Sequence, residues 1–118
     1  MKIAIPLQNG RVFPECGQPA EFALVDVDET TQTVRRSTAC PLPPLSAGGW
    51  ADWLAEQGVD VVLTRGIPPD QTTRLAEKGI QVVTGIPPFR VEAVVAGFLN
   101  DTLERGPNLC ETVPGMAA

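Results

Sequence analysis

Thiols and guanidinium groups are the side chains in this sequence with the clearest potential for binding chemistry. Cys16 and Cys40 lie in stretches rich in glycine and proline, as do Arg11, Arg65 and Arg90. Thiolates suit iron–sulfur, copper(I) and molybdenum–sulfur centres, and a neighbouring arginine balances the charge of an anionic cluster. Free cysteine is also a common inert core residue and arginine a common surface residue, so both interpretations stay open.

Backbone N–H groups in glycine-rich loops offer a second kind of contact to an anion. The candidate positions are Gly17, Ser46, Gly48, Gly49 and Gly66. The run 46–49 also precedes a predicted helix, whose first N–H groups attract negative charge. The same residues would serve equally well to keep the loop flexible and to cap the helix.

The absence of histidine excludes several kinds of catalysis. Ser-His-Asp and Cys-His mechanisms need an imidazole base, and many zinc sites need an imidazole ligand. The sequence also lacks a Cys-x-x-Cys pair, which disfavours a thiol–disulfide oxidoreductase. We therefore expect a binding protein and not an enzyme.

Length and charge narrow the class of protein. A chain of 118 residues predicts one domain, and its net charge of −5, with Arg35-Arg36 as its main basic pair, disfavours a nucleic-acid partner. We find no signal-peptide pattern and no apolar run long enough for a membrane span, so we expect a cytoplasmic protein. In the cytoplasm the three cysteines would be reduced thiols, with Cys110 incidental.

Hydrophobic periodicity predicts the elements that position these residues. Strands are expected at residues 2–6, 21–28, 33–38, 59–63 and from 82 onward, and helices at about 50–57, 70–78 and 91–99. Pro6 is expected to end the first strand, because proline has no N–H for the ladder. Trp50 and Trp53 share a helix face and are expected in the core. Residues 104–118 show no period and predict a flexible C-terminal tail.

The order of these elements predicts an α/β protein in three layers, α/β/α. The simplest sheet has five strands and is mixed, with the second strand antiparallel to the others and helices on both faces. The other four strands then end at one edge, which collects the loops 7–20, 39–49, 66–70 and 85–90. Open α/β sheets bind ligands at such an edge. The Gly-Ile-Pro-Pro sequence occurs twice there, at 66–69 and 85–88, and is interpreted first as two similar turns.

The chain resembles the dinitrogenase iron-molybdenum cofactor biosynthesis family, the NifX/NafY-like domain also found at the C-terminus of some NifB proteins. The resemblance rests on the opening KIAIP, the Asp26–Asp28 sequence DVD, LAEQGVDVVLTRGIPP and the closing VEAVVAGFLNDTL. It covers about residues 1–103 and implies a ribonuclease-H-like fold that carries a metal cluster without catalysis. Two positions depart from the family pattern: Cys16 stands where Phe is usual in a His-Phe-Gly sequence, and Pro68 replaces a glycine.

These observations give a hypothesis and two alternatives. We expect a cytoplasmic carrier of the iron-molybdenum cofactor, its precursor, or another Fe–S or Mo–S cluster, acting with nitrogenase assembly proteins as a monomer or homodimer. Cys16 and Cys40 are its candidate metal ligands. A nuclease, the first alternative, is disfavoured because KIAIP carries no carboxylate for divalent metals. The second is a small regulatory domain that uses the same edge for a protein or a small anion.

Overall fold

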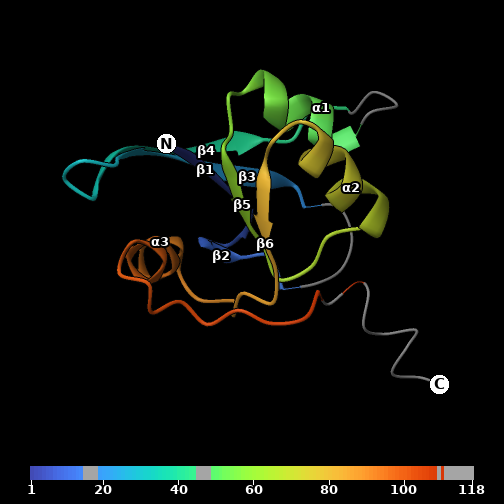
Figure 1. Ribbon diagram of the computed structural model, residues 1–118. Helices are drawn as coiled ribbons and strands as arrows, with labels where there is room; N and C mark the ends of the chain where they lie inside the picture. Colours follow the sequence, from blue (N-terminus) through green and yellow to red (C-terminus); the bar gives the residue numbers. More distant parts are fainter. Residues whose placement is uncertain (15–18, 45–48, 109, 111–118) are drawn as a thin grey trace.

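A computed structural model describes residues 1–14, 19–44, 49–108 and 110 (Figure 1). Its strands and helices follow the predicted order, with one added strand. In chain order they are β1 (Lys2–Gln8), β2 (Arg11–Val12), β3 (Glu21–Asp28), β4 (Thr33–Pro41), α1 (Gly49–Glu56), β5 (Val61–Leu63), α2 (Pro69–Glu77), β6 (Gln81–Val83) and α3 (Val91–Leu99).

The sheet is mixed, as predicted. Its strand order is β4-β3-β1-β5-β6, and β2 pairs with the end of β1. Strand β3 is antiparallel to both β1 and β4, whereas β5 is parallel to β1 and to β6. Strands β1, β4, β5 and β6 therefore end at one edge of the sheet, which confirms the predicted directions.

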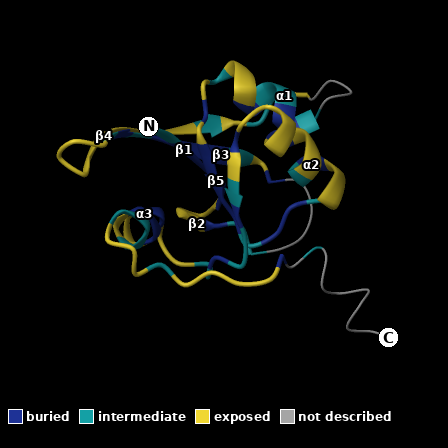
Figure 2. Ribbon diagram, viewed as in Figure 1, coloured by how far each residue is buried: buried dark blue, intermediate teal, exposed yellow. Residues whose placement is uncertain are grey.

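Helices cover both faces of the sheet, so the predicted α/β/α layering is confirmed (Figures 1 and 2). Helix α3 packs on one face over a cluster that includes Ile3 and Val25, and α1 and α2 pack on the other over Phe22 and Leu24. Trp50 is buried and meets Phe22 edge-on at 5.3 Å between ring centroids. The two tryptophans belong to this cluster, Trp53 at its margin, as the helical spacing predicts.

The helices end where the sequence indicates. Gly58 and Gly79 follow α1 and α2 with φ of 76° and 78°, a conformation that glycine adopts without steric penalty. Helix α3 has the predicted bounds, because its apolar residues repeat at helical spacing. In the described part of the chain, no helix is both long and apolar enough to cross a membrane.

The prediction that Pro6 ends the first strand is wrong. Strand β1 continues to Gln8, because β3 pairs with it as far as Leu7 and β2 takes over on its other side. The Pro6 carbonyl accepts a hydrogen bond from Phe13 N–H at 2.8 Å. A proline is tolerated here because neighbouring strands hold the backbone around it.

Strand β4 is longer than predicted and reaches Pro41. The prolines that begin at Pro41 predict a loop over residues 39–41. These residues pair with residues 21–23 of β3 instead. An edge strand tolerates this proline, since its outer side needs no ladder donor.

The chain returns to the sheet after α3, in the region predicted as a flexible tail. Gly106 N–H donates to the Thr84 carbonyl at 3.0 Å, and the Thr84 hydroxyl donates to the Gly106 carbonyl at 2.8 Å. The buried Asn108 side chain donates to the Ile67 carbonyl at 2.8 Å and accepts from Ile67 N–H at 2.9 Å. We call residues 104–108 the strap. These contacts join the strap to the sheet, and the flexibility of the region from residue 104 stays a prediction.

Candidate functional site

A tight hairpin at the end of β1 presents the first site arginine. Asn9 and Gly10 have φ of 54° and 76°, and β1 and β2 pair on either side of them. Positive φ at both central residues is the geometry that an Asn-Gly hairpin turn favours. The turn places Arg11 on β2 at the edge where the parallel strands end.

The same hairpin joins Arg11 to Arg90. These two residues form an antiparallel bridge just before α3 begins. The flanking hydrogen bonds run from Val12 N–H to the Phe89 carbonyl at 3.0 Å and from Val91 N–H to the Gly10 carbonyl at 3.2 Å. Two candidate residues that are 79 positions apart in the sequence are thus directly opposed.

Both arginines are exposed, and neither belongs to an ion pair with another described residue. The two ion pairs among the described residues, Arg35–Asp28 and Lys78–Asp52, do not involve this bridge. Like charges directly opposite on paired strands are destabilising. The Arg11–Arg90 pair is therefore a local concentration of positive charge that an anion would relieve.

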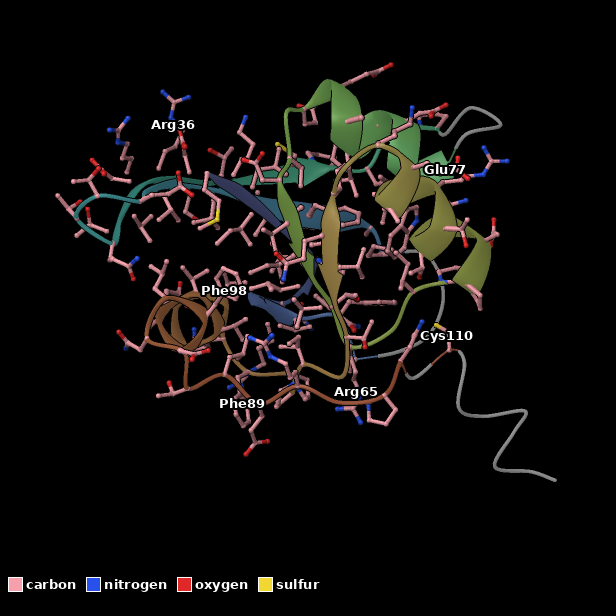
Figure 3. All side chains as sticks on the ribbon, in the orientation of Figure 1. Arg36, Arg65, Glu77, Phe89, Phe98 and Cys110 are labelled. Carbon is pink, nitrogen blue, oxygen red and sulfur yellow. The ribbon has the colours of Figure 1, made fainter. Side chains whose placement is uncertain are left out.

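Arg65 lies two residues beyond the end of β5. Its Nε atom is buried and has no hydrogen-bond partner, and its carbonyl accepts from Gly85 N–H at 3.2 Å. Figure 3 shows Arg65 at the lower end of β5 and β6, beside the strap that leads to Cys110. A buried guanidinium N–H without a partner is costly, and an acceptor at this point would satisfy it.

Each copy of the repeated Gly-Ile-Pro-Pro sequence is anchored in the core by its isoleucine. Ile67 and Ile86 are each fully buried, but in clusters on opposite faces of the sheet. Gly66 is buried and its carbonyl accepts from the Thr64 hydroxyl at 2.9 Å. The repeat therefore has a packing role on both faces, and a binding role for it stays a prediction.

Gly49 has a packing role at the start of α1. Its φ is 63°, and a Cβ atom there would lie 2.8 Å from the Gln71 side-chain oxygen. That oxygen accepts from Ala51 N–H at 3.3 Å, so Gln71 already occupies one of the free N–H groups of the helix. The other residues of this predicted loop site, Ser46 and Gly48, lie outside the described residues, and so do Cys16 and Gly17.

Cys40 is a free thiol that the fold separates from the arginines. It lies near the end of β4, opposite Phe22, and packs at the margin of the apolar cluster under α1. Strands β3 and β1 stand between β4 and β5, a separation of roughly 14 Å at about 4.8 Å per strand. The structure therefore brings Arg11 and Arg90 together but leaves Cys40 apart from them.

Cys110 is disulfide-bonded, so the expectation of three reduced thiols is wrong for this residue. Its N–H donates to the Asn108 side-chain oxygen at 3.0 Å, which fixes it beside the strap. Over residues 1–14, 19–44, 49–108 and 110, no three acidic, cysteine or histidine side chains are grouped as a metal site.

Sequence reasoning missed three features of this edge. The Asn9-Gly10 pair was available as a hairpin signal and would have indicated β2. Phe89, next to Arg90, is 52% exposed and gives the edge an open aromatic face. The docking of Asn108 on Ile67 joins residues 41 positions apart and carries no local signal. Together the edge offers arginines, an aromatic ring and a backbone strap, an arrangement suited to binding an anion.

Solved structures share this fold. The chain superposes on the crystal structure of PH0822 with a TM-score of 0.82 and 25% identity, over 94% of this chain and 99% of that one. It is similar to the apo form of the orange protein from Desulfovibrio gigas, with a TM-score of 0.70 and 25% identity over 91% and 93%. A protein from Methanocaldococcus jannaschii described as a candidate dinitrogenase gives 0.69 and 16% over 92% and 96%. No curated protein matches the sequence.

The family follows from the sequence as a whole. The family model described as dinitrogenase iron-molybdenum cofactor matches residues 1–101. That span holds the Arg11–Arg90 pair and Arg65, and it ends just before the strap. The resemblance found in the sequence is thereby confirmed: the chain belongs to the dinitrogenase iron-molybdenum cofactor family.

Proposed function

We propose that this protein is a non-enzymatic carrier that holds an anionic iron–sulfur or molybdenum–sulfur cluster at the edge where β1, β5 and β6 end. The iron-molybdenum cofactor or a precursor is one such cluster. The observation that carries the proposal is the Arg11–Arg90 bridge, which opposes two guanidinium groups without a carboxylate within ion-pair distance in the described structure. An anionic cargo would remove the repulsion that this arrangement creates.

Arg65 supports the same assignment. Its buried Nε lacks an acceptor, and the residue follows a parallel strand at the position where α/β sheets bind ligands. Membership of the cofactor family and the similarity to a protein studied in an apo form agree with a cargo that enters and leaves. Nitrogenase assembly proteins as partners, and the cytoplasm as compartment, belong to this proposal.

The cargo would be held in two ways. The arginines supply positive charge and N–H donors to the sulfides or oxides of the cluster. In the reduced protein, Cys16 is the predicted thiolate ligand, and Cys40, on the far side of β3 and β1, is the weaker candidate of the two. Such a site would bind and transfer its cargo without a chemical step on it.

The test is an anaerobic titration of reduced, metal-free protein with tetrathiomolybdate, followed by absorption and equilibrium dialysis. The double variant Arg11→Gln/Arg90→Gln should bind at least about tenfold more weakly, since two charge-assisted contacts are lost. Arg74→Gln, on the exposed side of α2, removes a charge away from the edge and serves as control.

Unfolding of the metal-free variants shows whether the fold is intact. Removing the opposed charges in Arg11→Gln/Arg90→Gln should leave the free energy of unfolding unchanged or raise it by up to about 0.5 kcal/mol in low salt. Weaker binding would then reflect a lost contact and not a damaged fold. Equal affinities of the double variant and Arg74→Gln would contradict the proposed site.

A further inference from the structure

Strand β4 leaves one edge of the sheet open. It has nine residues and, among the described residues, pairs only with β3, so no described strand covers the backbone groups of its outer side. The opposite edge strand, β6, has three residues, and the strap is hydrogen-bonded at Thr84 immediately beyond it. Figure 2 shows exposed residues at the hairpin tip and along β4, whereas β3 is largely buried. Long open edges are usually protected in proteins, so this one needs an explanation.

An apolar groove runs beside this edge on the α3 face. It encloses a cavity of about 340 Å³ between the sheet and the helix. Its apolar walls are Val25 and Val34 from the sheet and Val91, Val95 and Leu99 from α3. Val34 is 49% exposed, although it points to the same face as core residues of β3. The groove would accept an aliphatic side chain of a strand added to β4.

The opposite face of β4 presents one guanidinium group. Arg36 is the register partner of Asp26, so it points to the other side of the sheet from Val34. Figure 3 shows Arg36 directed away from α3. It has no ion pair within the described parts of the chain, whereas Arg35 pairs with Asp28 at 3.0 Å. An added strand would therefore meet a guanidinium group on one face and an apolar groove on the other.

These features disfavour a second copy of β4 as the added strand. Two copies would bring two Arg35–Arg36 pairs together, and like charges on paired strands repel. The charge instead selects a partner of opposite sign.

We propose that β4 binds an extended acidic segment of another protein, in which aliphatic and acidic residues alternate. Side chains of a strand point alternately to the two faces, so the aliphatic ones would enter the groove and the acidic ones would lie beside Arg36. The protein's own β3 shows this pattern, with Val25 and Val27 on the α3 face and Asp26 beside Arg36. This surface lies apart from the arginine edge and does not depend on a bound cluster.

The probe is a fluorescein-labelled hexapeptide of alternating valine and aspartate, titrated with metal-free protein and followed by anisotropy. A control peptide of the same composition, with three valines followed by three aspartates, cannot place its side chains on both faces as required. We expect it to bind at least about tenfold more weakly, because it loses either the groove or the charge contacts.

Two variants with matched controls locate the surface. Ala96→Phe fills the groove from the exposed side of α3, and Arg36→Glu reverses the charge; each should weaken binding about tenfold or more. Ala55→Phe and Arg74→Glu make the same changes on α1 and α2 and should leave binding unchanged. Circular dichroism confirms that all four fold.

Backbone pairing is tested with the peptide itself. N-methylation of alternate residues removes the donors that face β4 in one peptide and those that face solvent in the other, so one should lose binding and the other keep it. Equal losses for both methylated peptides, or equal affinities across the four protein variants, would overturn the proposal. Dimerisation of the free protein that Arg36→Glu changes, seen by sedimentation, would assign the edge to a second copy instead.

Discussion

Gly85 is the residue at which the strap and the sheet edge come closest. Its φ is 69°, and a Cβ atom there would lie 2.4 Å from the Gly106 nitrogen. Backbone atoms cannot move aside as a flexible side chain can. Glycine is therefore required at this position for two reasons. Its φ is positive, and the strap leaves no room for a Cβ atom.

Gly85→Ala should lower the free energy of unfolding by at least about 2 kcal/mol, as the left-handed backbone alone costs about 1 kcal/mol and the strap must also move. Gly79→Ala is the matched control, since Gly79 has φ of 78° but no atom within 4 Å of the added Cβ. Urea unfolding of both variants measures the difference. If both variants lost the same free energy of unfolding, the strap would move away from the added Cβ atom at no cost in stability.

At the scale of the elements, the hairpin of β3 and β4 is held at its tip by Asp28. One carboxylate oxygen accepts from Thr30 N–H at 2.9 Å and the other pairs with Arg35 at 3.0 Å. The hydrogen bond from Arg35, followed by that from Thr31 N–H, holds the pKa of Asp28 below its ordinary value of 3.8. The charged form is thus favoured in the folded protein.

This shift predicts a pH dependence. Because the folded pKa is the lower one, the contribution of Asp28 is fully present above about pH 4 and is lost as the pH falls through the folded pKa. Asp28→Asn should remove that part of the acid dependence and be less stable at pH 7, with the difference shrinking in acid. Thermal unfolding from pH 7 to pH 2 measures this. A difference that stays constant with pH would contradict it.

Local signals predicted most elements, and long-range contacts account for those that were missed. Helix α3 and the tryptophan face of α1 follow from spacing alone. Strand β1 continues beyond Pro6 because it pairs with β3 on one side and with β2 on the other. No local sequence pattern shows this pairing. The Asn9-Gly10 turn is the exception, since its residues did carry a signal for β2.

The candidate site itself stays a prediction, but the sequence predicted correctly which strands end at one edge, because the strand directions follow from the element order. They could not show that β3 and β1 separate Cys40 from Arg65, since strand order depends on packing across the whole sheet. Nor could they show that the hairpin would oppose Arg11 to Arg90.

At the scale of the whole molecule, the strap closes the edge beside the proposed cluster site. Four hydrogen bonds join Gly106 to Thr84 and Asn108 to Ile67. The Gly106 contacts lie beyond β6 and the Asn108 contacts lie at the turn after β5. Since hydrogen bonds contribute about 0.5–1.5 kcal/mol each, the strap should add about 2–6 kcal/mol to the stability of the fold.

Two shortened chains test whether the strap belongs to the domain. A chain ending at Cys110 keeps all four hydrogen bonds and should unfold like the full protein, whereas one ending at Leu103 should lose about 2–6 kcal/mol. Asn108→Ala in the full chain should lose about half of that. All are compared by urea unfolding with thiols reduced, so that the disulfide of Cys110 does not contribute.

Amide hydrogen exchange measures the local effect of the strap in these shortened chains. The Ile67 amide, which donates to the Asn108 side chain, should exchange faster in the chain that ends at Leu103, while Val62 in the buried sheet should change less. If the two shortened chains were equally stable and protected Ile67 equally, the domain would end near residue 103. The strap would then rest on the edge without stabilising it, and the proposed cluster site would be open to solvent on that side.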